Sequence, residues 1–561
     1  MFIFNFDLET SFDPQTKIWS GAKQQNYYDR NCSIGQIIFE EMRRRPNKIC
    51  QISDTENTKT SNTEALLQAI RVAKFFNSIG LSQTDIVGLV DRNTTHMMDV
   101  VLACFFTGIA FHAINPKHDD ATSKQLFNIT KPKIIFCDGQ DYDKMLRVSE
   151  DFETKLITLK NHLHNVQNIL SIVNQTLPEE LNFSRPAELE FGPNQTLAIL
   201  CSSGSTGLPK AVTIPNTMKA YDFTNYLTEN DIQFTPSTMD WLSGLLNLVT
   251  SLVYGTLRII SDKPYSPEYF LEVVEKYKVT FTIQAPSNMA MLLNCPDLSV
   301  EKLESMRYFL FGGGKCSTQI QAKLQSYLKQ GKLCCAYGFT ELTDVLTRNF
   351  NFFNKPNSVG RILPGLKVKI VNDEGVLLSH NEVGEIYCTH DKIWQGYYKN
   401  VKATMALRDT EGWFHSGDIG YFDEDNYLFI VDRKKDILKY RGMQYFPNEI
   451  EEVIRAMPEV VEVCVCGLWN DLDGDAAAAA VVPVVGSNLT VQHVLDYVQN
   501  NIQADYKQLH GGVIILTDLP KTATGKANKL AVKDILQNRL NFNMKSSPSI
   551  DINRPNTVFR S

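Results

Sequence analysis

As far as about residue 432, short apolar runs alternate with helical patterns along the chain. The runs 86–90 and 111–114 flank residues 97–107, whose dense apolar positions indicate a buried helix. A strand, a helix and a second strand in this order predict a βαβ unit. Continuous apolar runs are typical of strands buried on both faces, so parallel sheets between helical layers are expected. Further runs of this kind lie at residues 134–137, 197–201, 257–260, 279–283 and 308–311.

Two helix starts near the N-terminus carry capping boxes. Ser33 pairs with Gln36 and Ser61 with Glu64, and in each pair the side chains satisfy backbone N–H groups of the first helical turn. The second helix should end near Gly80.

The pattern changes after residue 432, where a charged run occupies residues 432–436. Beyond it the order is helix, strand, helix, strand, which predicts a small α+β domain of roughly 100 residues. The predicted fold is therefore α/β: a large N-terminal domain of helix-sandwiched sheets plus a small mobile C-terminal α+β domain. The expected boundaries are 1–432 for the large domain, 433–436 for a hinge, 437–540 for the small domain and 541–561 for a flexible tail.

Two apolar stretches are candidates for membrane spans, but neither fits. Asp99 and His112 interrupt the stretch 97–114, and the stretch 241–254 is shorter than the ~20 apolar residues that a bilayer requires. No transmembrane segment is expected. The first residues lack the features of a signal peptide, and the chain does not end in Ser-Lys-Leu. The expected location is cytoplasmic, with a peroxisomal location as the alternative.

The composition is that of an ordinary globular protein, with 43% apolar and 21% charged residues. A net charge of −7 offers no general attraction to nucleic acid, so no nucleic-acid partner is expected. The twelve cysteines show no CxxC pair and no histidine spacing typical of zinc sites. Reduced thiols in an intracellular compartment are the expected state.

A loop rich in serine and glycine follows the apolar run 197–201, where a βα-type loop is expected. Its glycines let backbone N–H groups converge on an anion, while hydroxyl groups and one ammonium group add further donors. The Walker spacing is absent. The loop therefore predicts a polyphosphate site, with a flexible surface loop as the alternative. The candidate ligands are Ser202, Ser203, Gly204, Ser205, Thr206, Gly207 and Lys210.

Four further segments follow this loop in a fixed order, at residues 337–341, 417–420, 432–442 and 520–526. Together with the loop, they resemble the adenylate-forming superfamily of acyl-CoA synthetases, carrier-linked adenylation domains and firefly-type luciferases. The resemblance extends over residues 33–540 and is nearest to insect luciferase-like and 4-coumarate-CoA-ligase-like members. Such enzymes join a carboxylate to the α-phosphate of ATP, and a thiol, usually coenzyme A, then displaces AMP.

The resemblance implies roles for individual residues. Lys526 would bridge the acyl carboxylate and a phosphate–ribose oxygen, Glu341 would bind Mg²⁺, and Thr340 would donate to a phosphate. The structural alternatives are a solvated lysine for Lys526 and a helix N-cap with a first-turn acid for Thr340 and Glu341.

The nucleotide itself would contact a second set of residues. Tyr337, with Gly338 beside it, would stack on adenine, Asp418 would accept from the ribose hydroxyls, and Arg433 would reach ribose or phosphate. Their alternatives are a core aromatic, a turn aspartate and a solvent-facing arginine. Gly313 and Gly314 would permit close approach of the backbone to adenine, although residues 312–315 replace the more usual Gly-Gly-Ala-Pro.

The second half-reaction would use the hinge and a channel. Lys435 matches the residue on which the small domain pivots, and Lys439 and Gly442 lie in the segment that lines the pantetheine path. A charged linker followed by a turn glycine is the alternative. Trp241 stands where the family often has a histidine, in the acyl part of the channel. An indole cannot carry a proton charge, which makes emission of light from luciferin less expected.

The predicted function is an ATP- and Mg²⁺-dependent acid–thiol ligase that uses coenzyme A as a co-substrate. A medium- or long-chain fatty acid is the expected acid, because the pocket segments 241–246, 279–285 and 308–311 offer few fixed charges. One alternative is a stand-alone adenylating enzyme that serves another thiol acceptor. Residues 527–561 are too few for a fused carrier domain. The other alternative is a catalytically silent acyl- or nucleotide-binding relative.

Overall fold

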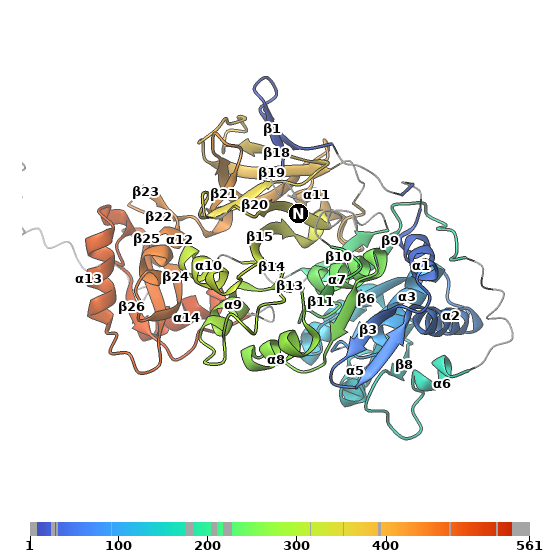
Figure 1. Ribbon diagram of the computed structural model, residues 1–561. Coiled ribbons are helices and arrows are strands. Elements are labelled where there is room, and N and C mark those ends of the chain that lie inside the picture. The colour runs from blue at the N-terminus through green and yellow to red at the C-terminus, as the bar shows by residue number, and fades with distance from the viewer. Residues whose placement is uncertain are drawn as a thin grey trace, which may run out of the picture. The chain divides into compact units, whose positions relative to one another are not determined.

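A computed structural model of the chain describes residues 8–23, 28–29, 32–90, 92–175, 183, 185–202, 210–216, 227–314, 316–351, 353–390, 394–441, 443–470, 473–522 and 526–540. These residues form two compact units, within Met1–Ile430 and Val431–Ser561 (Figure 1). The predicted class, a large α/β domain followed by a smaller α+β domain, is confirmed. The hinge at residues 433–436 stays a prediction, and the predicted tail lies outside the described residues.

The first unit contains the predicted βαβ unit within a six-stranded sheet. Strands β5 and β6 pair in parallel and are joined by α3 (Met97–Thr107), all of whose residues are buried. Only β10 runs antiparallel to its neighbour among the described strands of this sheet. In sheet order the strands are β10 (Lys210–Pro215), β9 (Thr196–Ser202), β6 (Ala110–Ala113), β5 (Ile86–Val90), β7 (Ile134–Cys137) and β8 (Lys155–Thr158).

Both predicted capping boxes are present. The Ser33 and Ser61 hydroxyl groups accept from the backbone N–H groups of Gln36 and Glu64, and those side chains bond back to the cap backbone. The helices of the first unit are α1 (Ile34–Arg44), α2 (Asn62–Ser78), α3, α4 (Asp120–Thr130), α5 (Tyr142–Val148), α6 (Leu170–Val173), α7 (Leu242–Tyr254), α8 (Pro267–Tyr277), α9 (Pro286–Leu293), α10 (Thr318–Tyr327) and α11 (Val401–Leu407).

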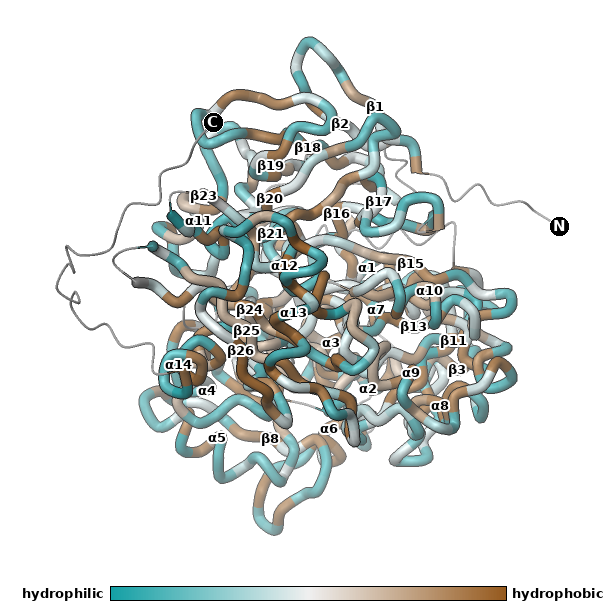
Figure 2. Tube along the Cα trace, turned by 90° about the vertical axis from the view of Figure 1, so that its left-hand side faces the viewer, coloured by the Kyte–Doolittle hydropathy of each residue, from teal (hydrophilic) through white to brown (hydrophobic). Residues whose placement is uncertain are grey.

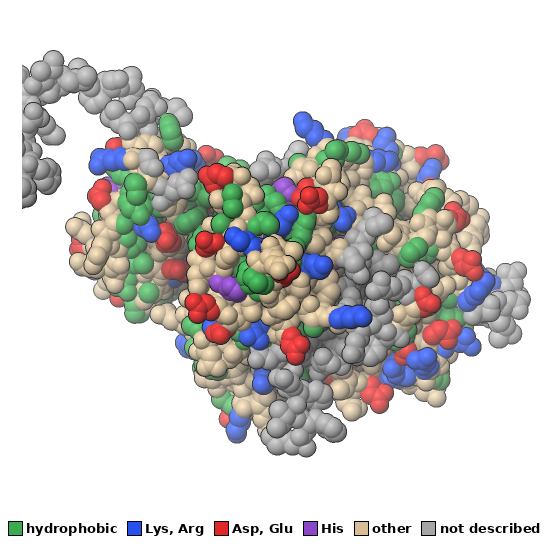
Figure 3. Space-filling model, turned by 90° about the horizontal axis from the view of Figure 1, so that it is seen from above, with side chains coloured by type: hydrophobic (Ala, Val, Ile, Leu, Met, Phe, Trp, Pro, Cys, Tyr) green, Lys and Arg blue, Asp and Glu red, His purple; other side chains and the backbone are tan. Residues whose placement is uncertain are grey.

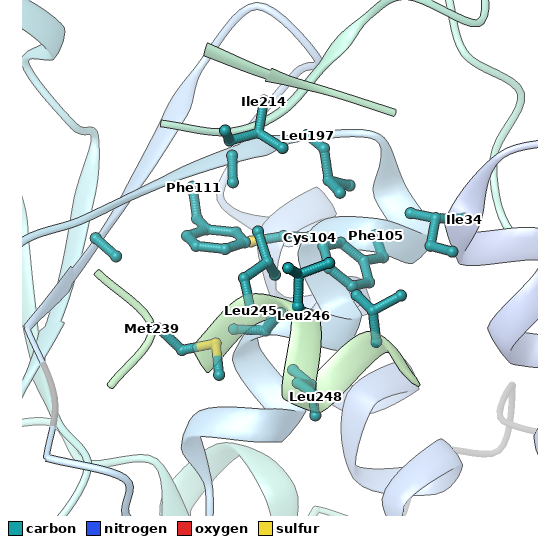
Figure 4. Packing of buried hydrophobic residues seen from close by; sticks show 14 of the residues in the cluster. Ile34, Cys104, Phe105, Phe111, Leu197, Ile214, Met239, Leu245, Leu246 and Leu248 are labelled. Atoms are coloured by element: carbon teal, nitrogen blue, oxygen red, sulfur yellow. The ribbon is translucent and has the colours of Figure 1, made fainter. Parts of the chain in front are cut away.

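Helix α7 is fixed by the core of the first unit. Figure 4 shows Leu245 and Leu246 of this helix beside Phe105 of α3, with Phe111 of β6 to their left and Ile214 of β10 above them. All five side chains are buried. The N-terminus of α7 is therefore held against the six-stranded sheet, and this places the residues that precede it.

A fifteen-stranded sheet, also in the first unit, combines parallel and antiparallel parts. The expectation of parallel sheets holds for one part. There, β12 pairs in parallel with β3 and β11, β13 with β11 and β14, and β15 with β14. That part comprises β3 (Ile49–Ser53), β11 (Ile232–Phe234), β12 (Leu257–Ile260), β13 (Phe281–Gln284), β14 (Tyr308–Gly312) and β15 (Lys332–Phe339).

The expectation is wrong for the rest of this sheet, which is antiparallel. Its strands are not continuous apolar runs, because buried positions alternate with less buried ones, as in β18, and such alternation is typical of sheets with one exposed face. These strands are β1 (Thr10–Asp13), β2 (Ile18–Gly21), β4 (Thr58–Ser61), β16 (Asp344–Asn349), β17 (Ser358–Ile362), β18 (Leu366–Val371), β19 (Gly384–His390), β20 (Phe414–Phe422) and β21 (Leu428–Arg433).

The second unit is a five-stranded sheet with helices on both faces. Helices α12 and α13 share one apolar cluster with the sheet, and α14 shares another. Figure 2 shows hydrophobic positions concentrated along the long strands of this sheet. The elements are β22 (Leu438–Tyr440), β23 (Met443–Tyr445), α12 (Pro447–Arg455), β24 (Val460–Asn470), β25 (Gly474–Pro483), α13 (Val491–Asn501), β26 (Gly512–Ile515) and α14 (Lys529–Arg539).

The strand β25, which the sequence pattern did not predict, contains a run of alanines. Ala477 and Ala479 face α12 and α13, whereas Ala478 and Ala480 face α14. Alanine favours helices, so the run gave no strand signal. Its small side chains nevertheless fit between helices that cover both faces of the sheet.

Acidic and basic side chains are mixed on the surface. On the face drawn in Figure 3, the described Lys and Arg residues are interspersed with Asp and Glu and form no continuous basic patch. Within the described ranges, each helix is too short or too polar to cross a membrane.

Candidate functional site

Two of the predicted nucleotide-binding residues meet in the first unit. Tyr337 lies on β15 and Asp418 on β20, and the tyrosine hydroxyl donates a hydrogen bond of 2.6 Å to Asp418 Oδ2. Burial, together with the Asp418 carboxylate, raises the pKa of Tyr337 well above its usual value. The hydroxyl therefore stays protonated and remains a donor.

Gly338 and Gly417 allow the backbone conformations beside these two residues. A Cβ atom on Gly338 would lie 2.8 Å from the carbonyl oxygen of Asp344, where β15 has an irregular register. Gly417 has a φ of 69°, in the left-handed region that favours glycine. The Asp418 backbone N–H then donates to Ser416 Oγ, 3.0 Å away.

The predicted phosphate loop is described only at its two ends. Ser202 ends β9, Lys210 begins β10, and the two residues are paired across an antiparallel hairpin. The expected βα-type connection is therefore wrong, because the apolar run after Lys210 is a strand and not a helix. Five predicted ligands lie outside the described residues, namely Ser203, Gly204, Ser205, Thr206 and Gly207.

Glu341 lies in a short 3-10 turn (η3, Thr340–Leu342) directly after β15. It is buried, and its Oε1 accepts a 2.6 Å hydrogen bond from the hydroxyl group of Tyr397. The turn begins at Phe339 without a side-chain cap, so the alternative role of Thr340 as an N-cap is wrong.

Sequence reasoning did not single out Tyr397. Besides its bond to Glu341, its ring lies 4.8 Å from the Nζ atom of Lys210, a cation–π distance. The pair Tyr397-Tyr398 after Gly396 is visible in the sequence, but the sequence does not indicate a partner for it.

The site can supply one carboxylate to a magnesium ion. Oε1 of Glu341 is taken by Tyr397, and no described residue donates a hydrogen bond to Oε2. Nor does the described part of the chain contain a group of three or more His, Cys, Asp or Glu residues placed to hold a metal. Mg²⁺ is commonly bound by one or two carboxylates plus substrate phosphates and water, so Glu341 fits this mode of binding.

The predicted glycine wall lies at the end of β14. Gly313 has a φ of 79°, and a Cβ atom added there would have no neighbour within 4 Å. The nearest atom to a Cβ on Gly314 would be Pro286 Cγ, at 3.7 Å. Both glycines thus border open space, while Lys315 lies outside the described residues.

Trp241 is the N-cap residue of α7 and is half-buried. Its backbone N–H donates to the carbonyl group of Thr238, at 3.1 Å. The preceding Asp240 accepts from Asn115 Nδ2, at 3.0 Å, and from the Thr238 hydroxyl group. Burial raises the pKa of Asp240. This carboxyl group therefore ties the loop before α7 to the loop after β6, directly beside the predicted acyl segment.

The remaining predicted residues belong to the second unit, so their approach to the nucleotide stays a prediction. Arg433, Lys435, Lys439 and Lys526 are exposed, and Gly442 lies outside the described residues. Asp436, at the end of the predicted hinge, is held by Lys529, whose Nζ lies 2.9 Å from Asp436 Oδ2.

At the start of the hinge, Asp432 is also bound within the second unit. Its carboxylate accepts from the backbone N–H groups of Arg433, at 2.7 Å, and Asn448, at 3.2 Å. Both ends of the predicted hinge therefore have hydrogen-bond partners.

Two family models match parts of the chain. Residues 38–398 match the family described as AMP-binding enzyme, and residues 449–526 match the AMP-binding enzyme C-terminal domain. A luciferin 4-monooxygenase of Photinus pyralis is 28% identical over 521 residues, covering 90% of this chain and 94% of its own.

Two further proteins are similar over most of the chain. The 4-coumarate–CoA ligase CCL1 of Humulus lupulus is 26% identical over 516 residues, covering 89% of this chain and 93% of its own. The crystal structure of ATP-bound MatB from Rhodopseudomonas palustris has the same fold, with a TM-score of 0.82 and 23% identity. That match covers 91% of this chain and all of the MatB chain.

Proposed function

The chain belongs to the family of adenylate-forming AMP-binding enzymes, and from this we propose that it is an acid–thiol ligase that makes an acyl-CoA through an acyl-adenylate. ATP, Mg²⁺ and a carboxylic acid would be used in the first half-reaction, and coenzyme A in the second.

One observation carries the proposal: residues from four separate segments form a connected set in the first unit. Lys210 at the end of the phosphate loop contacts Tyr397, and Tyr397 bonds to Glu341. Glu341 follows β15, whose Tyr337 bonds to Asp418. The set supports a nucleotide site in which the base and ribose ligands lie at one end and the phosphate and metal ligands at the other.

In the first half-reaction, a carboxylate oxygen of the acid would attack the α-phosphorus of ATP. A new C–O–P bond forms as the bond to the bridging oxygen breaks, and pyrophosphate leaves with that electron pair. Two anions approach each other in this step, so fixed cations and donors lower its barrier. Lys526, Lys210 and Thr340 would supply them, and Mg²⁺ held by Glu341 would neutralise phosphate charge.

In the second half-reaction, the thiol sulfur of coenzyme A would attack the acyl carbon as its proton passes to water. The bond from that carbon to the phosphate oxygen breaks, and AMP leaves with this oxygen and its electron pair. The proposed pivot Lys435 lies between Asp432 and Asp436, each of which has partners in the second unit. Both anchors belong to the same unit, so the pivot role of Lys435 rests on the family to which the chain belongs. Lys439 and Gly442 would line the path of the thiol.

The proposed acid is a medium- or long-chain fatty acid. Support comes from the apolar helix α7 and from Trp241 at its N-terminus, a bulky side chain without a protonatable group. Luciferases are among the similar proteins, but an indole in this position does not favour the same chemistry. Burial raises the pKa of Asp240, which disfavours a negative charge beside the acyl segment.

The decisive experiment measures AMP release from ATP with short-, medium- and long-chain fatty acids, with and without coenzyme A. The proposal predicts acid-dependent AMP release that coenzyme A strongly stimulates, together with formation of the thioester. AMP release that coenzyme A does not stimulate would favour an adenylating enzyme that serves another thiol acceptor. A protein that binds ATP but releases no AMP with any acid would be a silent relative.

A further inference from the structure

Tyr397 joins two residues that the proposed reaction uses for different purposes. Its hydroxyl group donates to Oε1 of Glu341, at 2.6 Å, and its ring lies 4.8 Å from Nζ of Lys210. These partners are more than a hundred positions apart in the sequence. The tyrosine is only 6% exposed and Glu341 is buried too, so the hydrogen bond between them is shielded from water.

The backbone around Tyr397 is fixed on the strand that carries Lys210. The N–H of Tyr398 donates to the carbonyl group of Ala211, at 2.8 Å, and Tyr397 forms a bridge with Val212. The carbonyl group of Gly396 accepts from both the N–H and the hydroxyl group of Thr213. Residues 396–398 therefore extend the edge of β10 and move with it.

The ring is also held from the side. The Trp394 ring packs edge-on against it, with centroids 5.3 Å apart, and Trp394 Nε1 donates to the carbonyl group of Thr213, at 3.0 Å. The ring thus has one position relative to the end of the phosphate loop, and the hydroxyl group has one direction, toward Glu341.

A hydroxyl donor at one carboxylate oxygen orients the whole carboxylate plane. In this bond the Tyr397 hydroxyl group is the donor and Glu341 Oε1 is the acceptor. With Oε1 held in this way, Oε2 is the oxygen left to face a cation. Partners of this kind fix ligands in many metal sites.

We propose that Tyr397 is a positioning residue that orients the magnesium-binding carboxylate of Glu341 and aligns it with Lys210 at the end of the phosphate loop. The inference rests on the proposed function, since it assumes that Glu341 binds Mg²⁺ and that Lys210 faces ATP. It goes further because one side chain, Tyr397, would fix the position of the Mg²⁺ ligand relative to the end of the phosphate loop.

The test is Tyr397→Phe in the full-length protein. Phenylalanine keeps the ring, its packing on Trp394 and its contact with Lys210, and it removes only the hydroxyl group. ATP binding is measured by calorimetry across a range of Mg²⁺ concentrations, without any acid. Loss of a ligand's orienting partner typically weakens metal binding about 10- to 100-fold. We expect the Mg²⁺ concentration that supports half-maximal ATP binding to rise at least about tenfold.

Tyr398→Phe is the matched control. It removes the same atom one residue away, and no described residue bonds to the Tyr398 hydroxyl group. Its Mg²⁺ dependence should match that of the wild type. Glu341→Gln provides a second check: in that background, adding Tyr397→Phe should change the Mg²⁺ dependence little, because the carboxylate that the hydroxyl orients is gone.

The outcomes separate the inference from the function. If the wild type binds ATP with Mg²⁺ and Tyr397→Phe has the same Mg²⁺ dependence, the positioning role is overturned and the proposed function stands. The positioning role is also overturned, again without loss of the proposed function, if the shift persists undiminished in Glu341→Gln. A wild type that binds no ATP at any Mg²⁺ concentration overturns both.

Discussion

The hydroxyl group of Tyr337 bonds to Asp418 at 2.6 Å, although 81 positions separate the two residues along the chain. If Tyr337 stacks on adenine and Asp418 binds the ribose, this bond fixes the distance between the side chain that binds the base and the side chain that binds the sugar.

Substitutions of Tyr337 and Asp418 should therefore have different effects on the KM for ATP. Tyr337→Phe keeps the stacking ring and should raise the KM for ATP only modestly. Asp418→Ala removes the acceptor for the ribose hydroxyls and should raise the KM for ATP more. It also leaves the buried Tyr337 hydroxyl without this partner, which typically lowers the free energy of unfolding by about 1–3 kcal/mol. Steady-state kinetics at varied ATP would measure both. Equal effects of the two changes would contradict separate roles.

Lys526→Ala should reduce acyl-adenylate formation about 100- to 1,000-fold, because it removes a cation that acts in the transition state. Thioester formation from supplied acyl-adenylate should change much less. Lys521→Ala is the control: it removes a lysine of the same segment that pairs with Glu462 and Asp518. Rapid-quench measurement of each half-reaction separates these effects, and equal loss in both would argue against the assigned role.

The hinge prediction concerns Lys435. Proline there fixes φ and removes a backbone donor. Pyrophosphate exchange should survive in Lys435→Pro, whereas CoA-dependent turnover should collapse if the small domain must rotate for the second step. Unchanged rates in both assays would contradict a mechanism in which the small domain rotates between the two half-reactions of this chain.

Asp432 gives a prediction about pH. Burial raises the pKa of this carboxyl group from 3.8 to about 6. The folded state thus prefers the neutral acid, and the resulting stabilisation is present below pH 3.8 and lost as the pH rises through 6. Between pH 4 and pH 6, the free energy of unfolding should fall with pH more steeply in the wild type than in Asp432→Asn. Parallel curves from chemical denaturation at several pH values would show that Asp432 does not titrate in this way.

Substitutions of Trp241 test the proposal that the acid is a medium- or long-chain fatty acid. Trp241→Phe should keep most activity, whereas Trp241→Ala should loosen the preference for chain length and slow the CoA step. The indole is half-buried, so the stability loss should be below the ~3–5 kcal/mol of a fully buried site. Values of kcat/KM across a fatty-acid series, taken on variants shown to be folded, are the measure. A large gain in adenylation with Trp241→His would point instead to a lost catalytic histidine.

Local chemistry made much of the fold predictable. Ser33 and Ser61 mark helix starts because their hydroxyl groups satisfy backbone donors a few residues away, and helix α3 has apolar positions throughout its length. The antiparallel strands from β16 to β21 were missed although most of them pair with neighbours in the sequence, because buried positions alternate with less buried ones, as in β18, and form no continuous apolar run. The family resemblance implied a common ligand for Tyr337 and Asp418, but not the bond between them.

Tyr397 could not be assigned from the sequence for a similar reason. Its role depends on Lys210, whose strand β10 forms a bridge with Tyr397, and on Glu341, which lies in the turn after β15. The spacing of motifs along the chain does not show which side chains come into contact in the fold.

The alanine run in β25 has a consequence for how the chain is made. Alone, such a segment favours a helix, so it becomes a strand only when β24 and β26 pair with it on either side. The parallel partner β26 is separated from β25 by α13. During translation, the second unit should therefore stay unfolded until Ile515 has left the ribosome, and its sheet should then form in one cooperative step.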